Sequence, residues 1–523
     1  MGDVGDVDAE RVRDERHRAH HRFTPGRHPG SRAAPGDEAN GGWEDAMLRH
    51  LLVQQSLQKV RRQSHHQHPA LQRGGTDHGR ERCVLGLLGL QHQGPDAAQV
   101  PRRRAAVHRR AGRRAHTFID RQQCRCLAGG ELDHRFKSAP MIINDKAIFG
   151  LVGQMQVAGG NFIVAIDLQT GEEVWRFYTI ARPDEAYGNS WNGMTLEERT
   201  GGSVWTPGSY DPETNLVYFG PAPTYDTVTM RESRNIAGTT SDALYTNSTI
   251  ALDADTGELV WHFQHVRNDL LDLDWAFERQ IIEVPFNGEM RRAVVTGGKA
   301  AIFEAMDATT GEYLFSIDMD MQNVFSEIDS RTGDKTMFPA AVLQPGEPTP
   351  GLAKNGVCPD ALGARNMQTT SYNPATNMLY IPMQDTCINN LTGSRWQKYP
   401  DVETEGQWGL VKAVDLTTRE VVWTTRQFAP PASGHLTTDS GLLFRGTIDR
   451  LFQAVDQDNG NVLWEQRLDN SPTSYPITYR VEGKQYVAVA TNAGSYFANG
   501  MERTTGIVNP PSGASLWVFA LPE

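Results

Sequence analysis

The chain has 523 residues, which is too long for one small domain and long enough for several domains or one large repeat array. Its formal charge is −12 at pH 7, so the whole chain lacks the basic excess of nucleic-acid-binding proteins. With 50 glycines and 28 prolines, it is turn-rich but far from collagen-like or low-complexity composition.

Residues 1–136 differ from the rest in composition. They hold 13 of the 16 histidines, 23 arginines, one lysine and no tyrosine, and they carry 24 basic against 16 acidic residues, whereas residues 137–523 carry 27 against 47. A basic arm for RNA or an acidic partner, plain disorder and a shifted reading frame of GC-rich DNA each account for this bias, and we favour the shifted frame. We expect residues 137–523 to form the folded domain.

No segment resembles a membrane span or a leader. The longest apolar run, Cys83 to Leu90, is too short to cross a bilayer. Met1 to Glu10 carries aspartates where a signal peptide has a basic and then an apolar stretch. Read literally, the sequence predicts neither a transmembrane helix nor a signal peptide.

A repeat organises residues 137–523. Five segments share two apolar residues, an aspartate, a short turn and a strand that usually ends in tryptophan: AIDLQTGEEVWRF from Ala165, ALDADTGELVWHF from Ala251, AMDATTGEYLFSI from Ala305, AVDLTTREVVWTT from Ala413 and AVDQDNGNVLWEQ from Ala454. Each segment predicts a β-hairpin whose aspartate caps the turn by accepting backbone N–H bonds. Such units bury their faces by stacking on one another, which favours a β-propeller over a tandem of β-sandwiches.

These repeats resemble the tryptophan-docking repeats of quinoprotein alcohol dehydrogenases, eight-bladed propellers that hold pyrroloquinoline quinone (PQQ) and a metal ion. More specific stretches between the repeats resemble the same family in the same order: GGSVWTPGSYDPETNLVYFG from Gly201, LDLDWAFERQ from Leu271, TGGKAAIFEAMD from Thr296, CPDALGARN from Cys358 and ITYRVEGKQYVAVA from Ile477. The resemblance covers residues 137–523 and implies an all-β propeller.

The number of repeats predicts an incomplete propeller. Five repeats and the closing strand Leu516 to Leu521 account for about six blades of the eight that the family has. Because residues 1–136 have no tyrosine and only Ile119 as isoleucine, we expect them to supply no partner for the closing strand. We therefore expect an exposed edge at each end of the array, and a chain that as written aggregates or binds PQQ poorly, so that its activity is impaired or lost.

Two aspartates form the main candidate site. Asp272 and Asp274 stand two residues apart, so an extended segment points both carboxylates to one side. Such a pair suits a hard cation, or one metal ligand and one general base. The resemblance implies that Asp272 is the catalytic base and also a metal ligand. It further implies that Asp274 is an additional metal carboxylate, as in lanthanide-dependent members.

The resemblance also implies four cofactor contacts. Lys299, in a GGKAA stretch, would bond the quinone oxygens and stabilise the charge that develops on reduction. Trp205 would form the floor under the flat cofactor, with Ser203 bonding a cofactor carboxylate. Asn366 would contact the cofactor edge, although a turn-forming asparagine explains this residue nearly as well.

Two family metal ligands are replaced in this chain. The glutamate of the family falls near Gln154 to Gln156, and its asparagine falls near Pro223. Gln156 or Asp226 is the nearest substitute, so Gln156 joins Asp272 and Asp274 as a candidate ligand for Ca²⁺ or a lanthanide ion. The adjacent cysteine pair of the family is missing, because Arg125 separates Cys124 from Cys126.

The remaining two cysteines indicate the cellular compartment, and the lack of a haem-attachment motif indicates how electrons would leave the protein. Cys358 and Cys387 are spaced like a disulfide of quinoprotein methanol dehydrogenases, which would imply the periplasm, and two buried thiols are the alternative. No CxxCH haem motif occurs, so electrons would leave to a separate acceptor such as a cytochrome c. The sequence thus predicts PQQ-dependent oxidation of alcohols, with an aldose or glucose-type dehydrogenase and a noncatalytic scaffold as alternatives.

Overall fold

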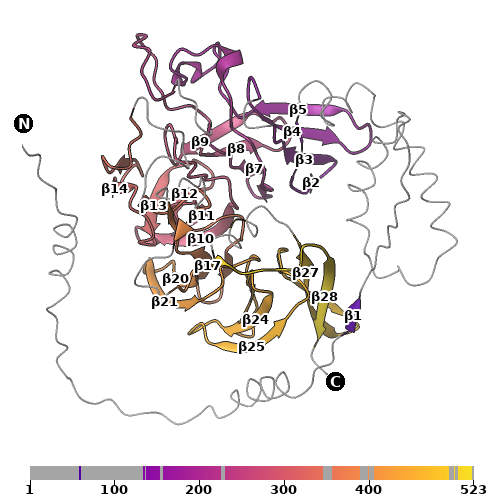
Figure 1. Cartoon of the computed structure of the whole chain (residues 1–523). Helices are drawn as coiled ribbons and strands as arrows, with labels where there is room; N and C mark the ends of the chain where they lie inside the picture. The colour runs from indigo at the N-terminus through magenta and orange to yellow at the C-terminus, as the bar shows by residue number, and fades with distance from the viewer. Residues whose placement is uncertain are drawn as a thin grey trace, which may run out of the picture. The chain divides into compact units, whose positions relative to one another are not determined.

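The computed structural model describes residues 134–135, 137–153, 157–224, 230–344, 356–388, 406–493, 500 and 505–520, together with the backbone of strands β1 and β19 (Figure 1). All of them belong to one compact unit, Gln54–Glu523. Before the proposed boundary at residue 136, only the backbone of β1 and residues 134–135 are described.

Six four-stranded antiparallel sheets make up most of the described residues. The first contains β2 (Met141–Ile143), β3 (Lys146–Gly150), β4 (Phe162–Asp167) and β5 (Glu173–Tyr178). The second contains β6 (Ser209–Asp211), β7 (Leu216–Phe219), β8 (Ser248–Asp253) and β9 (Leu259–Gln264). The third contains β10 (Gln280–Phe286), β11 (Glu289–Gly297), β12 (Ile302–Asp307) and β13 (Tyr313–Asp318).

The other three sheets follow in the same pattern. The fourth contains β16 (Ser371–Asn373), β17 (Met378–Gln384), β20 (Gly409–Asp415) and β21 (Glu420–Gln427). The fifth contains β22 (Leu436–Thr437), β23 (Leu442–Gly446), β24 (Leu451–Asp456) and β25 (Val462–Arg467). The sixth contains β26 (Ile477–Val481), β27 (Lys484–Asn492), β28 (Ala514–Ala520) and β1 (Gln58–Val60).

Shorter elements lie between these sheets. They are the 3₁₀ turns η1 (Gly188–Ser190) and η2 (Leu196–Glu198), the hairpin of β14 (Phe325–Ile328) with β15 (Lys335–Met337), and the pair of β18 (Cys387–Ile388) with β19 (Lys398–Tyr399). Within the part of the chain that the structure describes, the predicted all-β propeller architecture of about six blades is confirmed.

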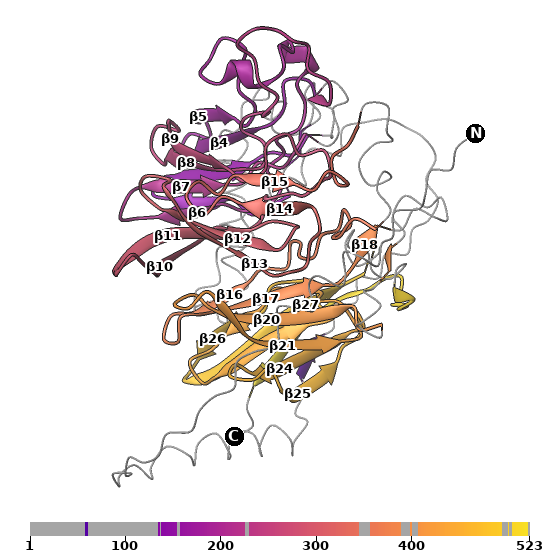
Figure 2. The ribbon, with the colours of Figure 1, turned by 90° about the vertical axis from the view of Figure 1, so that its left-hand side faces the viewer.

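The hydrophobic core lies between consecutive sheets, of which the first four follow one another in chain order from top to bottom in Figure 2. One buried cluster joins the first and second sheets through Ile163 and Ile250, and another joins the third and fourth through Phe303 and Ile381. Further clusters join the second to the third, the fourth to the fifth and the fifth to the sixth sheet. Each sheet therefore depends on its neighbours for burial, as the repeat pattern predicts.

The repeat aspartates cap their turns as predicted. In the first repeat, Asp167 Oδ1 accepts the backbone N–H groups of Gln169 at 2.8 Å and Thr170 at 2.6 Å. Both bonds recur at Asp253 and Asp307, and the bond to the N–H two residues later recurs at Asp415 and Asp456. A sixth turn of this kind, which the sequence analysis missed, closes hairpin β14–β15, where Asp329 accepts the N–H of Arg331 at 2.8 Å.

Tryptophan packs on glycine at three of the four contacts between consecutive repeats. The pairs are Trp175 with Gly257, Trp261 with Gly311 and Trp423 with Gly460, and a Cβ on any of these glycines would lie 2.5 to 2.8 Å from the indole. Each indole also donates to a carbonyl in the turn of the next repeat at 2.9 to 3.1 Å. At the contact of the third and fourth repeats, Phe315 replaces tryptophan and Arg419 replaces glycine. Here the guanidinium lies 4.2 Å from the phenyl centroid.

This exchange predicts energetic coupling between Phe315 and Arg419. Phe315→Trp alone should lower the unfolding free energy by about 1–3 kcal/mol, because the larger ring overpacks the space that Arg419 fills. Adding Arg419→Gly should recover most of that loss by recreating the tryptophan–glycine contact. Urea unfolding of the wild type, both single variants and the double variant measures the coupling, and strictly additive effects would contradict it.

The prediction that residues 1–136 supply no partner for the closing strand is wrong for β1. Gln58–Val60 pairs antiparallel with β28, with Gln58 opposite Val518 and Val60 opposite Leu516. The ladder is made of backbone groups, which any residue other than proline can provide, so a scarcity of tyrosine and isoleucine does not prevent three residues from pairing. At the other edge of the sixth sheet, all five residues of β26 are exposed.

Among the described residues, no helix is both long and apolar enough to cross a membrane.

Candidate active site

The candidate site is built on the segment between β9 and β10. Asp269 is buried, and its carboxylate accepts the N–H of Leu271 at 2.8 Å, the N–H of Leu273 at 2.7 Å and the side-chain amide of Asn247 at 2.7 Å. Burial raises the pKa of Asp269 to about 6, although the two backbone N–H bonds act to lower it. Asp272, between the two bonded amides, has a φ of +61°, in the left-handed region.

The structure brings Asp272, Asp274 and Lys299 together. The Lys299 ammonium lies 3.0 Å from Asp272 Oδ1 and 2.7 Å from Asp274 Oδ2. The side chains of Lys299 and Asp274 are 5% and 4% exposed, whereas that of Asp272 is 21% exposed. Asp272 is therefore the carboxylate of this cluster that a small molecule can reach.

The charges of this cluster perturb one another. Burial alone would lower the pKa of Lys299, but the Asp272 and Asp274 carboxylates outweigh it and raise that pKa above its usual value. Burial raises the pKa of Asp272, the Lys299 ammonium opposes this rise, and the charge of Asp274 adds to it. Lys299 therefore remains a cation, and Asp272 has a greater affinity for a proton than an ordinary surface carboxylate.

A second loop covers Lys299. The N–H of Lys299 donates to the Asp274 carbonyl at 3.0 Å, and the N–H of Ala364 donates to the Lys299 carbonyl at 2.8 Å. A Cβ on Gly363, which has a φ of +82°, would lie 2.6 Å from Lys299 Cγ, so only glycine lets the loop approach this closely. Asn366 is buried in this loop, where its amide donates to the Leu362 carbonyl at 2.8 Å and its oxygen accepts the next N–H.

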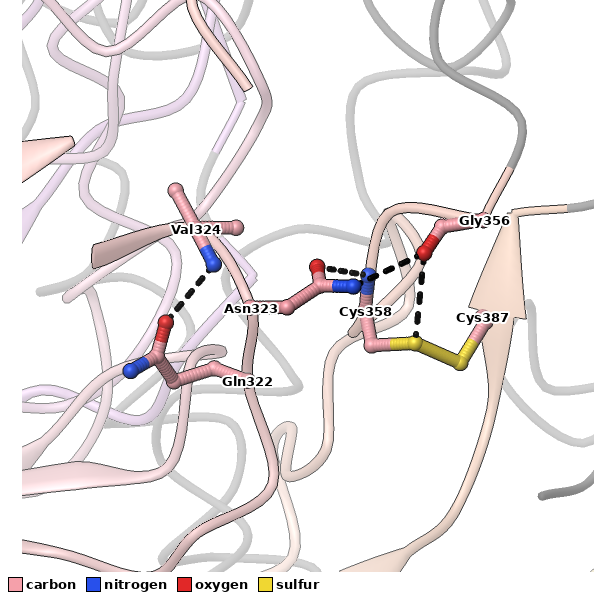
Figure 3. The surroundings of a disulfide bond; sticks show 6 residues. All are labelled: Gln322, Asn323, Val324, Gly356, Cys358 and Cys387. Carbon is pink, nitrogen blue, oxygen red and sulfur yellow. Dashed lines mark hydrogen bonds between the residues drawn. A yellow bond between two sulfur atoms is a disulfide. The ribbon is translucent and has the colours of Figure 1, made fainter. Parts of the chain in front are cut away.

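A disulfide fixes the start of this loop (Figure 3). Cys358 is bonded to Cys387 of β18. The N–H of Cys358 also donates to Asn323 Oδ1 at 2.8 Å, and the Asn323 amide donates to the Gly356 carbonyl at 2.9 Å. The disulfide and these bonds attach the loop that covers Lys299 to the β14 side of the fold.

Removal of the disulfide has a calculable effect. The bond closes a segment with a sequence separation of 29, so replacing both Cys358 and Cys387 by serine should lower the unfolding free energy by about 3–4 kcal/mol. Denaturant unfolding with and without dithiothreitol checks this. The wild type should lose stability in the reductant and the variant should not, and equal midpoints for the oxidised wild type and the variant would contradict the prediction.

The segment that contains Ser203 and Trp205 lies against the same region. Ser203 is buried, and the ring of Trp205 meets that of Phe277 edge-to-face at 5.4 Å. The hydroxyl of Thr206 donates to the Ala276 carbonyl at 2.5 Å. Trp205 and the two aspartates are thus joined through one segment, residues 272–277. Of the remaining candidates, Gln156 and Asp226 lie outside the described residues.

Sequence analysis missed the groups that hold Trp275, the residue after Asp274. His265 stacks on its ring at 5.4 Å with an interplanar angle of 7°, and the Lys335 ammonium lies 5.2 Å from the ring centroid. Arg279 donates to its carbonyl at 2.5 Å, and Asn247 Oδ1 accepts its N–H at 3.2 Å. A Cβ on Gly298 would lie 2.2 Å from the indole, which therefore packs on the backbone next to Lys299.

A buried ion pair supports this arrangement. Glu304 accepts from Lys335 Nζ at 2.6 Å and lies 2.6 Å from His265 Nδ1, and all three side chains are at most 2% exposed. Burial lowers the pKa of His265 to about 4, so it is neutral at pH 7. Burial alone would raise the pKa of Glu304, but Lys335 and His265 lower it. Lys335 comes from β15 and Glu304 from β12, and no local sequence pattern relates the two.

The donor set suits a hard cation. Asp274 Oδ1 is buried without a hydrogen-bond partner among the described residues, and a carboxylate oxygen in that state is a good ligand for Ca²⁺ or a lanthanide. Within the described residues, no group of three His, Cys, Asp or Glu side chains that could hold a metal occurs. The part of the site that the structure describes therefore supplies two carboxylates, Asp272 and Asp274.

Comparison with known proteins decides the family. The model of the β-propeller domain of PQQ-dependent glucose, ethanol and alcohol dehydrogenases matches residues 105–327 and 399–487, more than half of the chain. The chain belongs to this quinoprotein family. It is 28% identical to quinohemoprotein alcohol dehydrogenase ADH-IIG of Pseudomonas putida in an alignment 428 positions long, which covers 75% of this chain and 57% of that protein.

Other quinoproteins give the same result. Quinoprotein alcohol dehydrogenase PedH of Pseudomonas putida is 29% identical over 75% of this chain and 69% of its own length. Among solved structures, a europium-containing methanol dehydrogenase has a TM-score of 0.65 at 24% identity, covers 74% of both chains and shows the common fold. This quinoprotein spans 55% to 61% of the length of ADH-IIG and four other curated relatives.

Proposed function

We propose that this quinoprotein oxidises primary or secondary alcohols to aldehydes or ketones with PQQ as its cofactor. The observation that carries the proposal is the cluster of Asp272, Asp274 and Lys299, in which two carboxylates share one buried ammonium. Of these groups, Asp272 keeps the most exposed surface. A noncatalytic scaffold has no need of one buried and one partly exposed carboxylate around a buried lysine, since burial of such charges is costly.

In the proposed reaction, the Asp272 carboxylate accepts the proton of the substrate hydroxyl. Its raised pKa makes it a stronger base than a surface aspartate. PQQ would supply the acceptor for the hydride that leaves the carbinol carbon. A Ca²⁺ or lanthanide ion held by Asp272 and Asp274 would supply the Lewis acid that polarises this acceptor. Proton and hydride together account for the two hydrogens that the alcohol loses.

Lys299 has two roles in this proposal. Its ammonium holds Asp272 and Asp274 in place at 3.0 and 2.7 Å. It would also bond the quinone oxygens and stabilise the negative charge that develops there. Trp205 would supply the floor under the cofactor, Ser203 a bond to a cofactor carboxylate, and Asn366 a contact to the cofactor edge, while Gln156 would add a metal ligand.

We further propose that electrons pass to a separate acceptor such as a cytochrome c, and that the protein works in the periplasm. The disulfide Cys358–Cys387 supports an oxidising compartment. One relative bears the name lupanine 17-hydroxylase [cytochrome c], and it is 28% identical over 76% of this chain.

Reconstitution tests the function. The purified chain is titrated with PQQ in the presence of Ca²⁺ or La³⁺, and reduction of a redox dye is followed with ethanol or glucose as substrate. We expect ethanol-dependent dye reduction that requires both PQQ and a metal ion. The reduction should saturate only at high PQQ concentration, because the described array has six sheets where the family propeller has eight, and an incomplete array should bind PQQ weakly. Oxidation of glucose but not ethanol would show a sugar dehydrogenase, and the absence of any dye reduction at saturating PQQ would refute the enzyme.

A further inference from the structure

Asp269 lies three residues before Asp272 and does not itself reach the substrate side of the site. It is 3% exposed, and its carboxylate accepts three hydrogen bonds of 2.7 to 2.8 Å from Leu271 N, Leu273 N and Asn247 Nδ2. The two backbone donors stand directly before and directly after Asp272. One side chain therefore holds a peptide group on each side of the proposed base, namely the one that joins Leu270 to Leu271 and the one that joins Asp272 to Leu273.

The backbone of Asp272 needs such support. Its φ of +61° lies in the left-handed region, which costs a residue with a side chain about 1 kcal/mol or more. A strained residue keeps its conformation only where the surroundings over-determine it. Released from Asp269, the segment would relax toward an ordinary φ, and the Asp272 carboxylate would turn away from Lys299.

Asn247 extends this support into the second sheet. Its amide donates to Asp269, and its oxygen accepts the N–H of Trp275 at 3.2 Å. Its own backbone is bonded to the Pro221 carbonyl at 3.0 Å and to His265 N at 2.8 Å. The segment 269–275 is thus held at both ends by a residue that the β-sheet region fixes.

We propose that Asp269 is a positioning residue for the oxidation, which holds Asp272 in the orientation that accepts the substrate proton. The proposal rests on the proposed function of Asp272. The Asp269 carboxylate performs this role by accepting hydrogen bonds from the backbone N–H groups of Leu271 and Leu273. The side-chain amide of Asn247 holds the carboxylate in place.

The test compares Asp269→Asn with Asp253→Asn. Asp253 is a matched control, because its carboxylate accepts two backbone N–H bonds of 2.9 Å in a repeat turn away from the site. At saturating PQQ and alcohol, Asp269→Asn should lower kcat by about 100-fold with KM within about 3-fold, since displacement of a reacting group by about 1 Å has that effect. The control should keep kcat within about 2-fold.

Hydrogen–deuterium exchange of the chain without cofactor gives a readout independent of activity. The peptide that contains residues 270–275 should exchange faster in Asp269→Asn than in the wild type, while peptides of β8 and β9 should not change. Unchanged exchange, or a kcat equal to that of the control, would overturn the proposal. Faster exchange in a chain whose wild type oxidises no alcohol would retain the support role and refute the proposed function instead.

If Asp269→Asn does not fold, Asn247→Gly replaces it. Glycine tolerates the φ of +46° at this position and removes one donor to Asp269. The same pattern at smaller amplitude, a lower kcat at unchanged KM with faster exchange of residues 270–275, is expected, and its absence would overturn the proposal.

Discussion

Replacing Asp272 by asparagine should lower the kcat of alcohol oxidation by several orders of magnitude, up to about 10⁴-fold, while PQQ binding stays nearly intact. The amide keeps an oxygen that can accept from Lys299, so the geometry of the site is largely retained. It cannot accept the substrate proton, so the chemical step loses its base. Dye-coupled kinetics at saturating PQQ, with PQQ binding measured separately, checks both parts.

Asp320→Asn is the matched control for this variant. Asp320 also has a positive φ, +56°, but it is exposed and follows β13. Its replacement tests whether aspartate-to-asparagine exchange in a left-handed conformation is harmful in itself. Near-normal turnover in Asp272→Asn would exclude Asp272 as the base.

Replacing Lys335 by methionine should lower the unfolding free energy by about 3–5 kcal/mol, because Glu304 is left as a buried carboxylate without its ammonium partner. Both side chains are at most 2% exposed, so water cannot replace the lost partner. Trp275 loses the cation above its ring at the same time. Urea unfolding followed by circular dichroism measures the loss.

Two further variants define the origin of that loss. Lys335→Met combined with Glu304→Gln should be more stable than Lys335→Met alone, because no uncompensated charge remains in the core. Asp334 lies on the same hairpin as Lys335 and forms an ion pair with Arg267, but the Asp334 and Arg267 side chains are 56% and 59% exposed, so Asp334→Asn should cost at most about 1 kcal/mol. A loss in Lys335→Met no larger than that of Asp334→Asn would refute the assignment.

Local sequence determined the repeating part of this protein. The aspartate of each repeat bonds N–H groups two or three residues later, so the turn forms wherever its residues occur together. The alternating apolar strands around that turn bury faces that only a neighbouring sheet can cover, which is why the propeller could be predicted. Linear motifs also identified Asp272, Asp274 and Lys299 as site candidates, through resemblance to a family whose motifs keep that order, but only the structure showed that the two carboxylates pair with the ammonium.

Tertiary structure alone decided the contacts that join distant segments. Lys335 reaches Glu304 from a hairpin 31 residues away in sequence, Phe315 meets Arg419 across two sheets, and β1 pairs with β28 through backbone groups. Asp269 carries no mark in the sequence that separates it from any other turn aspartate. Its importance depends on burial and on the left-handed backbone of Asp272, and both arise only when sheets and loops that are remote in the chain pack together and exclude water from the groups between them.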